Sequence, residues 1–212
     1  MSDHYYSANP QSDHKPAQVH FSYRGHTLAF RTDSGVFSRL EIDKGTELLL
    51  QSLPEALHGA VLDMGCGYGV MGISVGKAYP DCSVTMADIN SRAVELAAAN
   101  AGENGVKARC LQGDGYNALP PGEEFDLILQ NPPIRAGKNV IYAMFACAAQ
   151  RLGPEGALWL VIRKQQGAPS AMTYLKTLFA RVDAVAKKGG YWILCCGCPL
   201  DSAQEGDHSH AL

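Results

Sequence analysis

The stretch that decides the fold is Phe125-Asp126-Leu127-Ile128-Leu129-Gln130-Asn131-Pro132-Pro133-Ile134. Its first five residues have the apolar character of a buried strand, and an amide side chain and two prolines follow. Each proline lacks a backbone N–H and holds φ at about −65°, and the residue before a proline is driven toward extended backbone. We therefore expect a rigid, outward-turning step at the carboxyl end of a strand, which is where open α/β sheets bind ligands.

Such a step presents the Asn131 side-chain oxygen and nearby backbone carbonyls as converging acceptors. Converging acceptors suit an –NH2 group, because holding both hydrogens directs its lone pair toward an incoming electrophile. An ordinary surface turn accounts equally well for this stretch taken alone, since Asn and Pro are common in turns. As a functional site, Asn131, Pro132 and Pro133 are the predicted catalytic residues for chemistry on an amino nitrogen.

A second stretch, Val61-Leu62-Asp63-Met64-Gly65-Cys66-Gly67-Tyr68-Gly69, favours the functional interpretation. It is a short apolar strand with an acid, followed by glycines at alternate positions that allow a sharp turn and close approach of a ligand. The G-x-G-x-G spacing differs from the G-x-G-x-x-G of dinucleotide-binding folds. Together the two stretches resemble the class I S-adenosylmethionine (SAM) methyltransferases that act on amino nitrogens through an Asn-Pro-Pro step.

Under this resemblance three acids at the carboxyl ends of successive strands bind the cofactor. Asp63 lies near the cationic amino end of SAM, Asp88 accepts both ribose hydroxyls, and Ile89 covers the adenine. Asp114 accepts from the adenine amino group, and the Gly115 N–H faces a ring nitrogen. Each acid alone is more typical of a surface residue, but the order of the three favours a cofactor site. The full set assigned to SAM is Gly35, Val36, Phe37, Asp63, Gly65, Cys66, Gly67, Tyr68, Gly69, Asp88, Ile89, Asp114, Gly115 and Asn131.

Strands and helices alternate from residue 60 onward, which predicts an α/β fold with a mostly parallel sheet and helices on both faces. A β-hairpin of residues 19–23 and 27–31 precedes this core, and Gly25 lies in its turn. The last two strands form a second hairpin, which adds one antiparallel strand. The predicted strands are 60–63, 83–88, 107–111, 125–129, 157–162, 182–187 and 191–196, and the predicted helices are 44–53, 70–79, 91–103, 138–151 and 169–180.

The chain is predicted to form a single domain over residues 17–198. Residues 17–42 form the hairpin and a loop, and residues 43–198 form the SAM-binding core. The polar residues 1–16 are an N-terminal arm, and we expect a disordered tail at 199–212.

The composition is that of a globular protein, with 46% hydrophobic and 18% charged residues. The net charge of −3 excludes a global basic field of the kind that dominates non-specific nucleic-acid binding. No apolar run is long enough to span a membrane, and the first residues lack a signal-peptide pattern. The seven cysteines are interpreted as reduced thiols of a cytoplasmic protein. Cys195-Cys196-Gly197-Cys198 has no second cluster at zinc spacing, so no metal is expected.

Read as a whole, the chain resembles the "methyltransferase small" family, which includes bacterial ribosomal RNA guanine-N2 methyltransferases, and most resembles its short single-domain members. The resemblance implies a Rossmann-like class I fold with a seven-stranded sheet. It also implies that the Gly35–Phe37 loop closes over the methionine end of SAM, and that Asn131 and the Pro132 carbonyl hold the target amine. Methyl transfer is then a direct displacement governed by proximity, without a metal or a covalent nucleophile. The resemblance rests on residues 4–7, 33–38, 63–69, 131–138 and 164–170.

Many relatives have an aromatic residue after Asn-Pro-Pro that stacks on the target base, whereas this chain has Ile134. Phe37, Tyr5 or Tyr6 can supply a ring instead, or all three pack structurally. The predicted substrate-binding residues are Ile134, Arg135, Lys138 and Lys164, and the further candidates for RNA contact are Lys15, Arg163, Lys187 and Lys188. A base within a duplex has to be flipped out to reach Asn131.

The predicted function is methyl transfer from SAM to an exocyclic amine, guanine N2 of small-subunit ribosomal RNA. A protein glutamine amide and adenine N6 are alternative targets. A SAM- or RNA-binding module without turnover is an alternative from another class, and a nicotinamide dehydrogenase is disfavoured by the glycine spacing. The oligomeric state is left open.

Overall fold

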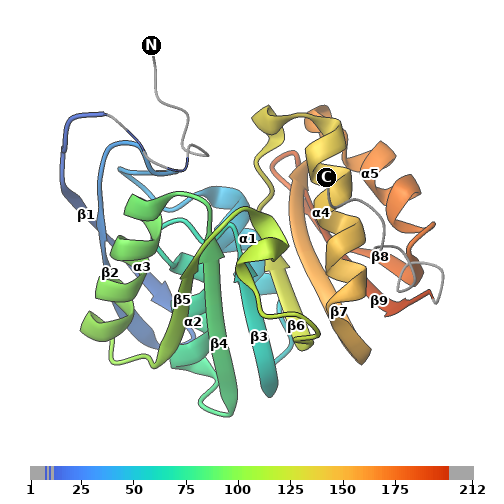
Figure 1. Cartoon of the computed structure of the whole chain (residues 1–212), viewed down its shortest axis with the longest axis horizontal. Helices are drawn as coiled ribbons and strands as arrows, with labels where there is room; N and C mark the ends of the chain where they lie inside the picture. Colours follow the sequence, from blue (N-terminus) through green and yellow to red (C-terminus); the bar gives the residue numbers. More distant parts are fainter. Residues whose placement is uncertain (1–7, 9, 11, 201–212) are drawn as a thin grey trace.

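The computed structural model describes residues 8, 10 and 12–200. Its centre is a seven-stranded sheet with the strand order β5-β4-β3-β6-β7-β9-β8 (Figure 1). Strands β5, β4, β3, β6 and β7 are parallel, and β9 is antiparallel to both of its neighbours, which confirms the predicted mostly parallel sheet. The strands are β3 Gly59–Met64, β4 Cys82–Asp88, β5 Ala108–Gln112, β6 Phe125–Gln130, β7 Leu152–Arg163, β8 Phe179–Lys188 and β9 Tyr191–Pro199.

Helices cover both faces of the sheet, as predicted (Figure 1). One apolar cluster joins the sheet to α1, α2 and α3 through residues such as Leu49, Ile73 and Ala97, and a second joins it to α4 and α5 through Phe145 and Leu175. In the described part of the chain no helix is long and apolar enough to cross a membrane. The helices are α1 Lys44–Ser52, α2 Val70–Ala78, α3 Ser91–Glu103, α4 Lys138–Gln150 and α5 Ala168–Leu175, with short 3-10 turns η1 Gly115–Ala118, η2 Ile134–Ala136 and η3 Lys164–Gln166.

The predicted element boundaries differ most from the structure in two places. The helix expected at 169–180 ends at Leu175, because tight turns at Thr177 and Leu178 lead into β8, whose first residue Phe179 is buried. Strand β7 begins at Leu152, five residues before the apolar run, and shifts register against β6 in this extra segment. The apolar pattern did not show either change, since strand pairing extends β7 through polar residues.

The predicted tail and arm lie largely outside the described residues. Pro199 ends β9, and the Leu200 N–H donates to the Leu178 carbonyl at 2.9 Å, so the sheet edge continues to the start of the predicted tail. Residues 201–212, 1–7, 9 and 11 are not described.

The predicted N-terminal hairpin is present as β1 Ala17–Tyr23 and β2 His26–Thr32. Its β2 edge is bound by two asparagines one turn apart on α3. Asn100 Oδ1 accepts from the Arg31 N–H at 2.8 Å and its amide donates to the Arg31 carbonyl at 3.0 Å. Asn104 makes the same pair of bonds to Ala29, at 3.1 and 2.8 Å. The two side-chain amides thus pair with the backbone of β2 as a neighbouring strand would. This pairing fixes the hairpin and the loop that follows it.

Replacing Asn100 by leucine tests this attachment. Asn100 is fully buried, and its amide also donates to the Tyr68 carbonyl at 2.9 Å. Because the substitution leaves buried backbone groups unpaired, we expect the free energy of unfolding to fall by about 3 kcal/mol or more. Denaturant unfolding measures the change, with Asn139→Leu on the exposed start of α4 as the control. A loss no larger than that of the control contradicts the attachment.

Candidate active site

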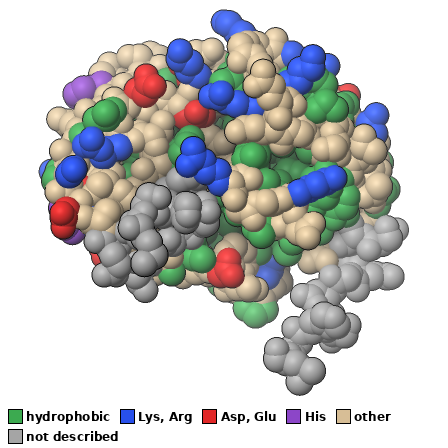
Figure 2. Space-filling model, turned by 90° about the horizontal axis from the view of Figure 1, so that it is seen from above, with side chains coloured by type: hydrophobic (Ala, Val, Ile, Leu, Met, Phe, Trp, Pro, Cys, Tyr) green, Lys and Arg blue, Asp and Glu red, His purple; other side chains and the backbone are tan. Residues whose placement is uncertain are grey.

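A cavity of about 490 Å³ opens at the carboxyl ends of the central strands. Chain connections diverge there, because β3, β4 and β5 extend the sheet in one direction and β6 and β7 in the other. Such a switch point is where open α/β sheets bind ligands. Figure 2 views this edge and shows an apolar hollow with Lys and Arg side chains around it.

The cavity brings together most of the residues predicted from the sequence. Among the predicted residues, the cavity is lined by Val36, Phe37, Gly65, Cys66, Gly67, Tyr68, Asp88, Ile89, Asp114, Gly115, Asn131, Pro132, Pro133 and Arg135. Predicted residues that do not line it are Gly35, Asp63, Gly69, Ile134, Lys138 and Lys164. Sequence reasoning missed Asp43 and Thr46 and the apolar walls Met64, Met71, Val140 and Met144.

The glycine turn after β3 is held against the end of β4. The Gly65 and Cys66 N–H groups donate to the Ala87 carbonyl at 2.8 and 3.1 Å, and the Gly67 N–H donates to Asp88 Oδ2 at 2.8 Å. Gly65 and Gly67 have φ of 73° and 55°, a conformation that favours glycine. A Cβ on either would meet no atom within 4 Å, so the turn leaves open space on its cavity side.

Gly69 does not line the cavity. It has φ of 96° at the start of α2, and a Cβ there would lie 2.8 Å from Ile73 Cδ1. The positive φ and the close packing against α2 both favour glycine at this position.

Asp63 lies beneath the turn and is fully buried. Its Oδ2 accepts from the Gly72 N–H at 2.7 Å, whereas Oδ1 has no hydrogen-bond partner. Burial raises the pKa of this carboxyl to about 7, against the opposing effect of the Gly72 N–H, and the nearby Asp88 adds to the rise. Asp63 thus ties the end of β3 to the first turn of α2, and an unpaired buried carboxylate oxygen favours a nearby cation.

Asp88 is one of the acids that line the cavity. Its Oδ1 accepts from the Asn90 N–H at 2.9 Å, and its Oδ2 accepts from Gly67. Burial raises its pKa, and the backbone donors of Asn90 and Gly67 partly oppose this. Asp114 lines the same wall and is exposed, and the Gly113 N–H donates to the Asp88 carbonyl at 3.1 Å.

The loop that contains Gly35 and Phe37 is tied to the start of α3. Asn90 donates to the Gly35 carbonyl at 2.7 Å, and Arg92 donates to the Ser34 carbonyl at 2.8 Å. Tyr68 of the glycine turn donates to the Ser38 carbonyl at 3.0 Å. These bonds hold Phe37, which is 38% exposed, at the mouth of the cavity.

The side chain of Asn131 is oriented by the first turn of α1. Its amide nitrogen donates to Asp43 Oδ2 at 3.1 Å and to Thr46 Oγ1 at 3.0 Å. Asp43 also caps α1 by accepting from the Thr46 N–H at 2.9 Å, and the Tyr191 hydroxyl lies 3.5 Å from Asp43 Oδ1. Because both amide hydrogens are used, the Asn131 oxygen remains as an acceptor at the cavity wall. An Asp directly before a predicted helix indicates an N-cap in the sequence. The hydrogen bond between Asp43 and the distant Asn131 has no such signal.

Ile134 packs away from the cavity, against the apolar cluster of α4 and α5. The wall beside Asn131 is instead formed by Pro133, Arg135 and Ala136. Lys138 and Lys164 are exposed outside the cavity. In the part of the chain that the structure describes, no group of three His, Cys, Asp or Glu side chains is arranged to hold a metal ion, and all seven cysteines are free.

The residues present fit SAM. Carboxylates at Asp88 and Asp114 suit hydroxyl and amino donors, apolar walls suit an adenine, and the unpaired Asp63 oxygen suits a nearby cation. Among solved structures, the *Thermus thermophilus* 16S rRNA N2 G1207 methyltransferase in complex with AdoMet and guanosine superimposes with a TM-score of 0.79 and 26% identity, over 89% of this chain and 52% of that one. Topology, cavity and this likeness define the class: the chain is a Rossmann-like, SAM-dependent methyltransferase.

Residues 27–195 match the methyltransferase small domain, and the chain belongs to that family. It is 44% identical over 196 residues to the uncharacterized protein YbxB of *Bacillus subtilis* (strain 168), which covers 92% of this chain and 98% of that protein. It is 41% identical over 172 residues to the ribosomal RNA small subunit methyltransferase C of *Hahella chejuensis* (strain KCTC 2396), over 75% of this chain. The chain spans about half the length of that methyltransferase.

Asp63→Asn is expected to change how stability depends on pH. The raised pKa means that the folded state retains a proton that the unfolded state releases between about pH 4 and 7. The wild type therefore loses stability, relative to the variant, as the pH rises through this window, by up to about 1.4 kcal/mol per pH unit. Unfolding free energies measured from pH 4 to 8 give the difference, with the exposed Asp81→Asn as the control. A pH-independent difference for Asp63→Asn contradicts the raised pKa.

Thr46→Val is expected to slow methyl transfer without weakening SAM binding. The substitution removes one of the two acceptors that orient the Asn131 amide but leaves the backbone cap to Asp43. Losing this hydrogen bond raises the activation free energy of methyl transfer by about 1.4 kcal/mol, which lowers kcat about tenfold. Thr46→Ser keeps the hydroxyl and is the matched control. Equal kcat values for the valine and serine variants show that the bond does not contribute.

Proposed function

We propose that this methyltransferase transfers the methyl group of SAM to an exocyclic amino nitrogen, guanine N2 of small-subunit ribosomal RNA. The observation that carries the proposal is the orientation of Asn131. Asp43 and Thr46 occupy both hydrogens of its amide, so the group it offers to the cavity is an acceptor, and an amine is a donor. The choice of guanine is supported by the structural relative, which acts on N2 of a guanine in 16S rRNA.

In the proposed mechanism Asn131 Oδ1 and the Pro132 carbonyl each accept one hydrogen of the target amine. Holding both hydrogens directs the nitrogen lone pair across the cavity, and SAM supplies the electrophilic methyl group. The chain contributes proximity and orientation, which is the main requirement of a direct displacement. The amine loses its extra proton after transfer, so no strong general base is required of the protein.

In the proposed cofactor site Asp88 accepts the ribose hydroxyls, Asp114 and Gly115 face the adenine, and Ile89 covers it. Gly65 and Gly67 admit the methionine end close to the backbone, where Asp63 attracts its amino group. The Gly35–Phe37 loop covers this end and limits access of water. The open space beside the two glycines and their positive φ support this arrangement.

For the substrate we propose that Phe37 supplies the aromatic surface that Ile134 does not. Phe37 lies at the cavity mouth, whereas Ile134 is partly buried against the apolar cluster of α4 and α5. Arg135 lines the wall next to Asn131, and Lys138 and Lys164 contact RNA outside the cavity. The target nucleotide is flipped out or unpaired, because the cavity admits a base and not a duplex. The protein acts in the cytoplasm, where ribosomal subunits are assembled, and without a metal.

The test is methyl transfer from labelled SAM to ribosomal RNA, naked and within subunits, taken from cells that lack this protein. Asn131→Ala is compared with Asn139→Ala, which removes an exposed asparagine from the nearby start of α4. We expect N2-methylguanosine after digestion to nucleosides, a loss of at least about 100-fold for Asn131→Ala, which corresponds to about 2.7 kcal/mol, and no loss for the control.

The outcomes separate the alternatives. Label in N6-methyladenosine changes the target base, and label in protein changes the substrate to a glutamine amide. SAM binding by the wild type without transfer to either substrate favours a module without turnover. Each of these three results overturns the proposal.

A further inference from the structure

Charge is distributed very unevenly along this chain. Residues 131–199 contain nine Lys and Arg but only two acids, Glu155 and Asp183, which gives this part a formal charge of +7. Because the whole chain has a net charge of −3, the remainder has −10. The overall acidity therefore conceals a strongly basic segment, residues 131–199.

The fold gathers six of these cations at the edge of the sheet where the cavity opens. Arg163 ends β7, and Lys187 and Lys188 end β8, which runs parallel to β7 because both are antiparallel to β9. Carboxyl ends of parallel strands meet at one edge, and η2, η3 and the start of α4 lie at the same edge. We name this group the basic rim: Arg135, Lys138, Arg163, Lys164, Lys187 and Lys188, all of them exposed.

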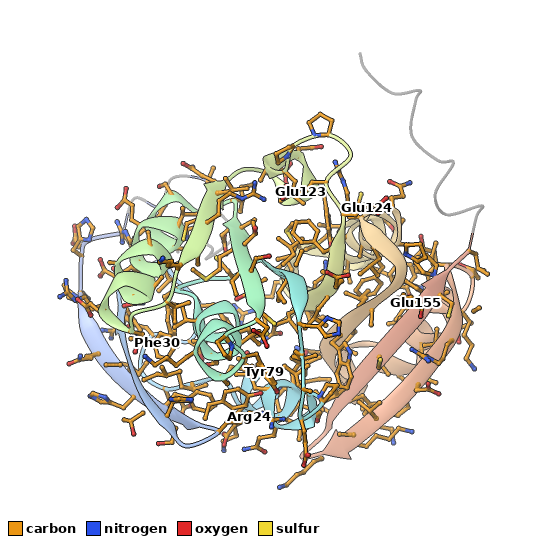
Figure 3. All side chains as sticks on the ribbon, turned by 90° about the horizontal axis from the view of Figure 1, so that it is seen from below. Arg24, Phe30, Tyr79, Glu123, Glu124 and Glu155 are labelled. Carbon is orange, nitrogen blue, oxygen red and sulfur yellow. The ribbon has the colours of Figure 1, made fainter. Side chains whose placement is uncertain are left out.

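The two acids of this segment lie away from the rim. Asp183 is in the middle of β8, opposite Cys195 of β9. Glu155 lies near the start of β7 and is seen from the opposite side of the molecule, together with Glu123 and Glu124 (Figure 3). Neither acid of residues 131–199 therefore neutralises the rim.

Three rim cations lie over aromatic rings. The Lys187 ammonium is 3.9 Å from the centre of the Trp192 ring, the Arg163 guanidinium 4.5 Å from that of Tyr191, and the Lys138 ammonium 5.0 Å from that of Tyr142. A ring beneath a cation restricts its side chain at little desolvation cost. Cations combined with aromatic surface are the usual composition of sites for single-stranded nucleic acid.

The rim is connected to the reacting groups. The Lys164 N–H donates to the Gly190 carbonyl at 2.8 Å, which fixes the β8–β9 turn against η3. Tyr191, which follows this turn, places its hydroxyl 3.5 Å from Asp43, and Asp43 binds Asn131. Figure 2 shows Lys and Arg side chains beside the apolar hollow on this face. A polyanion lying on the rim therefore passes beside the cavity.

We propose that the basic rim is the docking surface for the phosphate backbone of the RNA strand that flanks the target nucleotide, an inference that rests on the proposed function. The β8–β9 hairpin end, with Lys187 and Lys188, binds phosphates at a distance from the chemistry, and Arg135 binds next to the flipped base. The hairpin cations thus set RNA affinity, whereas Asn131 and its supports set turnover.

The test compares two full-length variants with the same change of charge. Lys187→Glu/Lys188→Glu reverses the hairpin end of the rim. Lys107→Glu/Lys176→Glu reverses two exposed lysines at the opposite edge, one before the first residue of β5 and one after α5. Binding of a single-stranded ribosomal RNA fragment is measured at several salt concentrations, together with KM and kcat for RNA methylation and the affinity for SAM.

For the rim variant we expect RNA affinity to fall at least tenfold and KM to rise in parallel, with kcat and SAM affinity unchanged. The slope of log affinity against log salt decreases by about 1.4, since each phosphate contact to a single strand contributes about 0.7. The control variant stays within about twofold of the wild type.

Equal losses in the two variants, or no loss in either, overturn the docking surface while leaving the proposed function intact. A loss of kcat without a change in RNA affinity also overturns it. Wild-type protein that binds SAM but neither binds nor methylates RNA overturns the proposed function itself, which distinguishes the two failures.

Discussion

The site depends on the register between β3 and β6 at the centre of the sheet. Met64 pairs with Gln130, so the two strands leave the sheet side by side, and the next residues are Gly65 and Asn131. Parallel pairing thus places the glycine turn beside the Asn-Pro-Pro step, although more than sixty residues separate them in the sequence. A register shift of one residue would turn the side chains to the opposite face and separate the glycine turn from the Asn-Pro-Pro step.

Polar side chains whose burial costs free energy support this arrangement. Asp63 leaves one carboxylate oxygen unpaired in the core, and Asn131 gives both amide hydrogens to α1. Burying a polar group destabilises a fold unless the group forms hydrogen bonds. When the hydrogen bonds are formed, they fix the side chain in a single orientation. Asp63 and Asn131 are such groups beside the cavity, and Asn100 attaches the hairpin in the same way.

Charge follows the same division between the two halves of the sheet. The β3–β4–β5 half supplies the cavity acids Asp88 and Asp114, and the β6–β7–β9–β8 half supplies the cations of the basic rim. A net charge of −3 excluded a global basic field, but it said nothing about a local one. Parallel strands end at one edge, which is why cations distant in the sequence gather there.

The sequence by itself determined the sheet, its single antiparallel strand, the helices and the family, because apolar periodicity and the two motifs are local patterns. It also indicated most of the cavity lining, since those residues follow strand ends. Only the tertiary structure decided that Ile134 packs against the α4–α5 cluster, that Gly69 packs closely against α2, and that Asp43 and Thr46 orient Asn131. These depend on contacts between segments far apart in the chain, and the direction of a side chain after a proline step is set by the partners that the fold brings to it.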